Sequence, residues 1–151
     1  MSENKLQLID DLVLGKNICV LGTSDGRNPH VSLMAFLVDH ATMKFYFLSR
    51  KNSHKSQNIK KCPHVSILID TREEHLPDNR DKAMALTIQG VYAPINKPQT
   101  IKAITKHFLA KYPDMEKFAS HPDTELIRIK AKTGQLVCGL EDEFSTKFKN
   151  S

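Results

Sequence analysis

A basic, polar stretch between two apolar runs holds the residues best suited to bind an anion. From Arg50 to Lys61 the chain carries five Lys or Arg residues and no acidic one. A helix is predicted to start at Ser53, and the backbone amides at a helix start are unpaired donors at the positive end of the helix dipole. Ser53, His54 and Lys55 therefore describe a seat for a phosphate group. That phosphate could belong to a nucleotide cofactor or to a nucleic acid.

The net charge favours an anionic partner only weakly. The formal charge is +5 over 151 residues, and such an excess bears on association rather than on fold. A nucleic-acid binder usually adds a recognised motif or exposed aromatic side chains among its basic residues. The chain has no Trp, and most of its Phe and Tyr residues fall inside apolar runs. Nucleic-acid binding, which would depend steeply on salt, is the less favoured hypothesis, and no nucleic-acid partner is predicted.

The sequence suggests neither a membrane segment nor a metal site. No apolar run approaches the roughly 20 residues that span a bilayer, and the start, MSENKLQLIDDL, carries acids where a signal peptide needs basic and then apolar residues. We expect a cytoplasmic protein with no membrane partner. Cys19, Cys62 and Cys138 are far apart, which favours neither a disulfide framework nor zinc. Cys19 and Cys138 lie in apolar runs and are expected in the core.

The elements that position the basic stretch are mainly strands. The first half of the chain predicts an amphipathic helix over residues 3–14, with Leu6, Ile9, Leu12 and Val13 on one face. An Asp-Gly turn at residues 24–27 then separates two apolar runs. Three adjacent antiparallel strands are predicted, at residues 18–21, 31–38 and 43–49.

The second half continues the pattern of strands with few helices. After the helix at residues 53–61, residues 64–70 alternate between apolar and polar positions, as in a half-buried strand. Gly90 lies inside a strand pattern and predicts a bulge, a bend or a close approach of another backbone. The remaining predictions are a charged loop at 71–82, either plain surface or a lid, a strand at 83–95, a helix from Pro98 to Tyr112, and a final hairpin of 125–131 and 135–140 turning at Thr133-Gly134.

About seven strands and two longer helices, joined mostly by hairpins, indicate one domain over residues 1–151. Its expected class is mainly β, an antiparallel barrel with flanking helices. With this order in place, the chain resembles the pyridoxamine 5'-phosphate oxidase-like family of FMN-binding split barrels. The resemblance rests on Pro29-His30-Val31-Ser32-Leu33-Met34, Phe45-Tyr46-Phe47-Leu48-Ser49, Ser53-His54-Lys55 and Cys62-Pro63-His64-Val65-Ser66-Ile67, in this order.

The resemblance implies a split β-barrel that forms a homodimer, with FMN bound at the subunit interface. It also implies that the phosphate is held by Ser53, His54 and Lys55. The flavin would be lined by the backbone of one strand and by the end of another. These positions are Val31, Ser32, Leu33 and Met34 on the first strand, and Leu48 and Ser49 on the second.

Two departures from the family pattern bear on activity. His54 stands where the parent oxidase of the family has an Arg, and His is a weaker, pH-dependent cation. The parent oxidase also grips pyridoxal phosphate with an Arg-x-His pair on a closing strand, whereas this chain has Arg128-Ile129-Lys130 there. Pyridoxamine phosphate is therefore not the expected substrate.

The leading hypothesis is an FMN-dependent oxidoreductase acting on a small molecule of unknown identity. No side chain stands out as a catalytic acid, base or nucleophile, which fits hydride transfer to a flavin ring. A flavin-binding or electron-carrying module without a substrate is the alternative, and a deazaflavin or haem could replace FMN. Some candidate residues also have plainer interpretations. Ser53 fits a helix cap, Ser32 fits a core serine as well as a flavin contact, and His30 fits a surface strand residue.

Overall fold

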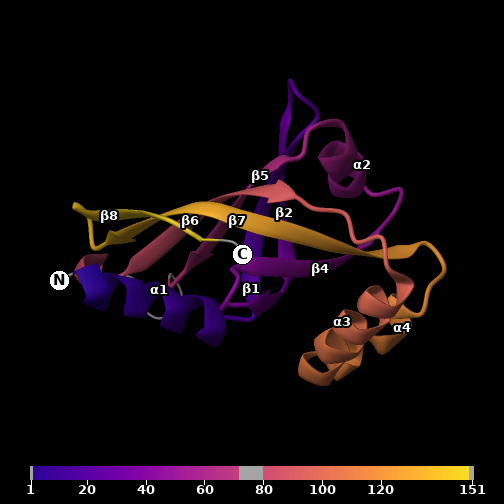
Figure 1. Ribbon diagram of the computed structural model, residues 1–151. Coiled ribbons are helices and arrows are strands. Elements are labelled where there is room, and N and C mark those ends of the chain that lie inside the picture. The colour runs from indigo at the N-terminus through magenta and orange to yellow at the C-terminus, as the bar shows by residue number, and fades with distance from the viewer. Residues whose placement is uncertain (1, 72–79, 150–151) are drawn as a thin grey trace.

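The computed structural model describes residues 2–71 and 80–149 and shows one curled antiparallel sheet with helices at its sides (Figure 1). Residues 72–79 of the predicted loop at 71–82 lie outside this description. The strands are β1 (Ile18–Ser24), β2 (Pro29–Ala35), β3 (Leu37–Asp39), β4 (Lys44–Arg50), β5 (His64–Asp70), β6 (Met84–Tyr92), β7 (Thr124–Cys138) and β8 (Asp142–Lys147). The helices are α1 (Ser2–Gly15), α2 (His54–Lys61), α3 (Pro98–Lys111) and α4 (Glu116–Ala119), with short 3-10 turns at Arg80–Lys82 and Pro113–Met115.

The sheet curls because its two edge strands are neighbours in the chain. Its order is β2-β1-β5-β6-β7-β4-β3, with β8 added beside β7. Only Phe36 separates β2 from β3, so the two edges cannot lie far apart. Phe36 is fully buried, and its carbonyl oxygen accepts a 2.6 Å hydrogen bond from the hydroxyl of Tyr112, just beyond α3. The result is a split barrel, closed by the chain at Phe36 rather than by a ladder of hydrogen bonds.

The core forms as the apolar pattern predicts. Val65, Ile67 and Ile69 on β5 are buried and alternate with more exposed residues. Ile9, Leu12 and Val13 on α1 join the same core, and Cys19 lies within it, as expected. The fourth residue of the predicted α1 face, Leu6, stays 42% exposed. No helix in the described residues is both long enough and apolar enough to cross a membrane.

The prediction of three adjacent strands in the first half is wrong. The predicted strand over 31–38 is two strands, β2 and β3, because the chain turns inward at Phe36. β2 pairs with β1, whereas β4 pairs with β3 and β7. Strands that follow each other in the chain therefore lie at opposite edges of one sheet.

The predicted turn at Thr133-Gly134 is also wrong, because β7 runs through it without interruption. Gly134 serves close packing instead. A Cβ there would lie 2.7 Å from the ring of Phe148. The chain turns five residues later at Gly139, whose φ of +67° is in the left-handed region, and β8 follows as the hairpin partner.

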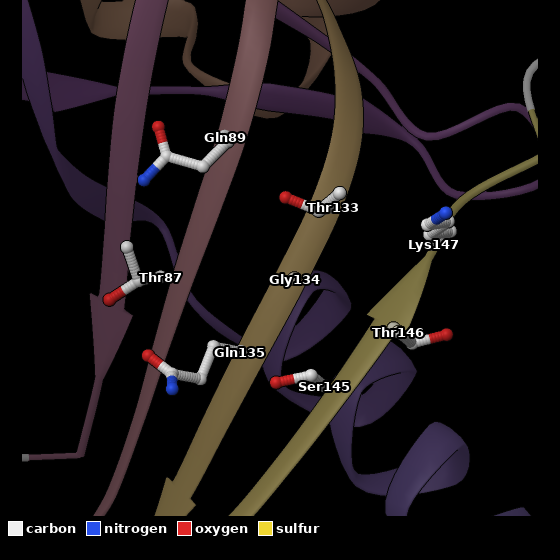
Figure 2. A pocket seen from close by; sticks show the side chains of 8 residues that line it. All are labelled: Thr87, Gln89, Thr133, Gly134, Gln135, Ser145, Thr146 and Lys147. Atoms are coloured by element: carbon white, nitrogen blue, oxygen red, sulfur yellow. The ribbon is translucent and has the colours of Figure 1, made fainter.

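The middle of the sheet's outer face carries few charges, whereas the next row of cross-strand neighbours holds Asp70 and Glu143. Two rows of cross-strand neighbours cross it from β2 to β8. They are Val31, Gly22, Ser66, Gln89, Thr133 and Lys147, and Leu33, Val20, Leu68, Thr87, Gln135 and Ser145. Lys147 is the one charged member of these rows. Figure 2 shows the β6, β7 and β8 end of this face, where a shallow hollow of about 430 Å³ is lined by uncharged polar side chains and Lys147.

Gly90 marks a bulge in the pairing of β6 with β7, as predicted. Gln89 lies opposite Thr133 and Gly90 opposite Ala131, so the register shifts between Gln89 and Gly90. A Cβ at Gly90 would lie 2.7 Å from a methyl carbon of Ile129 and 2.9 Å from the carbonyl oxygen of Lys130. The missing side chain is what lets the two strands approach here.

Gly90→Ala is therefore expected to lower the free energy of unfolding by about 1–3 kcal/mol, the usual cost of overpacking, because β7 must move. Urea unfolding followed by circular dichroism measures this loss. Gly15→Ala is the matched control, because a Cβ at Gly15 has no atom within 4 Å. A Gly90→Ala protein as stable as Gly15→Ala would show that the contact is not tight.

Candidate functional site

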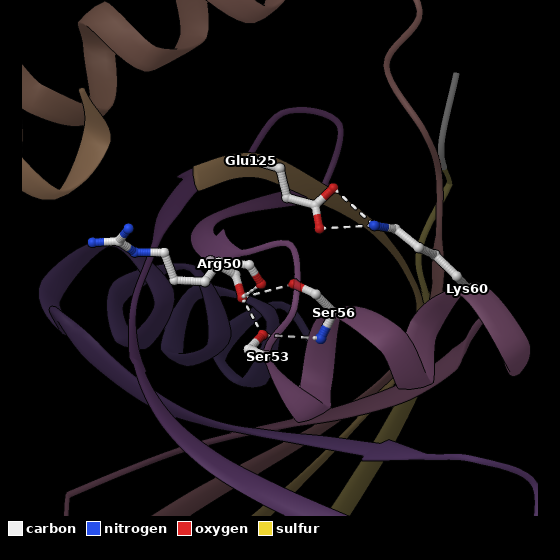
Figure 3. Close-up of polar contacts among 6 residues, drawn as sticks. Arg50, Ser53, Ser56, Lys60 and Glu125 are labelled. Carbon is white, nitrogen blue, oxygen red and sulfur yellow. Dashed lines mark hydrogen bonds and ion pairs between the residues drawn. The ribbon is translucent and has the colours of Figure 1, made fainter. Parts of the chain in front are cut away.

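A cluster of three serine hydroxyls, called the serine cluster below, fixes the start of α2 to the end of β4. Ser53 is the N-cap of α2, and its hydroxyl accepts a 3.3 Å hydrogen bond from the backbone amide of Ser56. The hydroxyl of Ser56 donates to that of Ser49 at 2.8 Å, and Ser49 lies 2.9 Å from Ser53 (Figure 3). Ser49 and Ser56 are buried. The sequence prediction that Ser53 caps the helix is confirmed.

The structure gives the predicted β4 residues a supporting position. The hydroxyl of Ser49 lies inside the serine cluster, where it holds the cap, and the side chain of Leu48 is buried. A phosphate at the start of α2 would therefore meet Ser53 and the helix amides before it met Ser49. Ser56 was not predicted from the sequence, since a serine inside a helix carries no signal of this bond.

α2 also lies across the hairpin of β1 and β2 and touches both strands. The Nδ2 of Asn58 donates to the hydroxyl of Thr23 on β1 at 3.1 Å, and both side chains are buried. His54, one turn earlier, stacks on His30 of β2, with 4.5 Å between ring centroids. Thr23 and His30 are cross-strand partners. The two contacts fix how the start of α2 faces β2.

Lys55 is the cation best placed to bind an anion at this helix start. It is partly buried, and desolvation lowers the pKa of its ammonium group below the ordinary value. The first turn of α2 holds no acid. None of the ion pairs found among residues 2–71 and 80–149 involves Lys55. A partly desolvated ammonium without a carboxylate is an energetic cost that an anionic ligand removes.

Two of the other basic residues of the stretch, Lys60 and Arg50, have partners elsewhere. Lys60 forms an ion pair with Glu125 at 2.9 Å, at the other end of α2. The guanidinium of Arg50 lies 4.7 Å from the ring centre of Phe118 and points away from the serine cluster (Figure 3). Lys55, with His54 beside it, therefore carries the positive charge at the helix start.

β2 offers its backbone as well as its side chains. It pairs with β1 along one edge only, so the backbone groups along its other edge have no strand partner among residues 2–71 and 80–149. Val31 and Leu33 are 69% and 72% exposed, while Met34 is buried. Ser32 lies with its hydroxyl 3.4 Å from Nδ1 of His30. The four predicted β2 residues thus divide between the two faces of a strand with a free edge.

The structure brings the predicted residues of β2, β4 and α2 into one region, because α2 contacts His30 on one side and Ser49 on the other. Its start lines neither the hollow of Figure 2 nor a second one of about 280 Å³ between β3, β4 and α3.

Comparison with known proteins identifies the family. A profile described as Pyridoxamine 5'-phosphate oxidase matches residues 6–138. No curated protein matches the chain. Among solved structures, ChuZ from Campylobacter jejuni is similar over 98% of this chain and 61% of its own, with a TM-score of 0.82 and 16% identity.

Two further structures are matched by this chain over almost their whole length. A Listeria innocua protein named after pyridoxamine 5'-phosphate oxidase matches 87% of this chain and 96% of its own, with a TM-score of 0.68 and 21% identity. HutZ, a haem storage protein from Vibrio cholerae, matches 94% of each chain, with a TM-score of 0.65 and 18% identity. At these identities the structures establish the shared fold alone, and the family assignment rests on the profile. The chain belongs to the pyridoxamine 5'-phosphate oxidase family.

Proposed function

We propose that this protein binds FMN and acts as a flavin-dependent oxidoreductase. The observation that carries the proposal is Lys55, a partly buried ammonium group without an acidic partner among the described residues, at a helix start without an acid. A phosphomonoester suits this site, because it accepts hydrogen bonds from helix amides and neutralises the ammonium. The family assignment supports a flavin phosphate over other phosphates.

Different residues of this chain would hold the phosphate and the flavin ring of the cofactor. Ser53 and the first amides of α2, with Lys55 and His54, would bind the phosphate. The free edge of β2, from Val31 to Met34, would supply backbone groups to the flavin. The serine cluster behind the cap keeps the helix start rigid.

When bound, the flavin supplies the hydride or electron transfer, and the protein supplies position and hydrogen bonds. No described side chain is assigned as acid or base. Arg128, on the strand where the parent oxidase grips its substrate, donates 3.1 Å hydrogen bonds to the carbonyl oxygens of Ala93 and Pro94. These bonds engage two of the donors of the guanidinium. We therefore propose a small-molecule substrate other than pyridoxamine phosphate. We also propose that the protein acts in the cytoplasm.

We also propose a homodimer that completes the cofactor site through the outer face of the sheet. Twelve residues form the two rows across this face, and Lys147 alone among them is charged, in a chain that is 26% charged. Depletion of charge is typical of the core of an interface. Val31 and Leu33 lie at its edge and expose most of their surface. A second copy would cover them and add residues to the cofactor site beside β2.

Two alternatives keep the fold and change the ligand or the role. A haem ligand is favoured by HutZ and by a similar haem-binding protein from Mycobacterium smegmatis, with a TM-score of 0.75. The chain covers 55% of the length of the latter. A flavin-binding electron carrier without a substrate is the second alternative. An absorption spectrum of the purified protein separates flavin from haem, and turnover with NAD(P)H and an electron acceptor separates an enzyme from a carrier.

Lys55→Glu is expected to weaken FMN binding at least tenfold, because it removes a charge-assisted bond to the phosphate and adds repulsion. The flavin that copurifies, measured by absorbance after denaturation, reports the loss. Lys61→Glu is the matched control, since it reverses the same charge at the exposed far end of α2. Equal flavin content in the two variants would remove Lys55 from the site.

Lys55→Met is expected to leave the ligand-free protein at least as stable as the wild type at pH 7. Burial lowers the pKa of Lys55 in the folded state, so unfolding takes up a proton between that lowered pKa and 10.5. At neutral pH the burial of the charged Lys55 lowers the stability of the wild type, and this loss of stability disappears as the pH rises. Melting temperatures from pH 7 to 10 should therefore converge. A variant that melts well below the wild type would indicate a structural contact.

Leu68→Glu is expected to dissociate the homodimer, because it buries a charge at the centre of the outer face. Light scattering measures the mass of the variant. Leu140→Glu is the control, since Leu140 is 79% exposed in the turn between β7 and β8. If Leu68→Glu keeps the mass of the wild type, the outer face is not the interface.

A further inference from the structure

Two histidines from different elements stack beside the proposed phosphate seat. The rings of His54, the first residue of α2, and His30 on β2 have centroids 4.5 Å apart and planes inclined by 27°. His54 is next to Lys55 in the chain. His30 in turn has its Nδ1 3.4 Å from the hydroxyl of Ser32, on the strand proposed to line the flavin. The stack therefore links the phosphate seat to the flavin strand.

The surroundings of the stack are positively charged. Lys55 is adjacent, and the amides at the start of α2 add the positive end of the helix dipole. β1 and β2 carry no charged side chain. The other charged groups near these elements are Lys60 and Lys61 on α2, Glu125 on β7 in an ion pair with Lys60, Arg50 and Lys51 before α2, and Asp25 and Arg27 in the turn of the hairpin.

Apart from Glu125, Asp25 is the only acid in these segments, and it is already engaged. Its carboxylate accepts hydrogen bonds from the backbone amides of Arg27 and Asn28, at 2.8 and 2.7 Å. These bonds hold the pKa of Asp25 below its usual range. A proton added to the stack without a bound anion would therefore place another positive charge beside Lys55, with no free acid in these segments to compensate it.

A bound phosphomonoester adds negative charge beside the stack and so offsets the positive charge of its surroundings. Above its second pKa of about 6 it brings nearly two negative charges to the helix start. A nearby dianion favours the protonated form of an imidazole ring. A proton on one ring of the stack would then complement the charge of the ligand. With both nitrogens of His30 protonated, the ring can only donate, so the hydroxyl of Ser32 becomes its acceptor.

We propose that the His30–His54 stack takes up a proton when a phosphomonoester binds at the start of α2, so that the affinity for FMN rises as the pH falls. This inference rests on the proposed function, because it needs the phosphate of FMN at that helix start. The pair acts as a pH-dependent second cation beside Lys55. The flavin occupancy of the protein would thereby respond to pH.

The test is titration with FMN between pH 7.0 and 8.5, a range in which the phosphate remains mainly dianionic. We expect the dissociation constant to rise about threefold to tenfold toward pH 8.5, since one coupled proton changes it by up to tenfold per pH unit. Calorimetry in buffers of different ionisation enthalpy should show uptake of a fraction of a proton up to one. Riboflavin, which lacks the phosphate, should show neither effect.

His30→Gln and His54→Gln should each reduce the pH dependence, and their melting temperatures show whether they fold. His40→Gln is the matched control, because His40 is exposed in the turn between β3 and β4. FMN binding that is constant across this range in the wild type would overturn proton coupling and leave the proposed function standing. The same slope in both stack variants would also overturn it. No FMN binding at any pH would overturn both proposals.

Discussion

The single residue between β2 and β3 constrains the whole structure. Because Phe36 joins the two edges of one sheet, the sheet has to curl, and β2 comes into contact with β4. At this closure of the sheet, β2 pairs with β1 alone, and α2 lies over the contact between β2 and β4. Burial of Phe36 and the hydrogen bond from Tyr112 to its carbonyl oxygen stabilise the closure. The candidate site is therefore a consequence of how the barrel closes.

The site combines a rigid support with an uncompensated charge. The serine cluster holds the start of α2, and the bond from Asn58 to Thr23 holds its middle. Lys55 stays partly buried without an acid among the described residues, which costs stability in the absence of a ligand. Structures usually keep such a cost where it serves binding. The low charge of the two rows on the outer face, where Lys147 is the one charged member, agrees with a site that a second copy completes.

Local features could be predicted from the sequence, and long-range pairing could not. The cap at Ser53, the alternation of β5 and the bulge at Gly90 depend on short-range rules of hydrogen bonding, side-chain period and backbone space. The turn prediction at Gly134 was wrong because glycine favours both turns and close packing. Only the ring of Phe148, which follows β8 and packs back on this position, shows that close packing applies. The stack of His30 on His54 was missed for the same reason, since no local pattern joins β2 to α2.

Native mass spectrometry of the protein titrated with FMN tests the central claim most directly, because it reports ligand and assembly together. The account predicts a dimer that binds two FMN molecules. A monomer that binds FMN fully, or a dimer that binds haem and leaves FMN free, would contradict it.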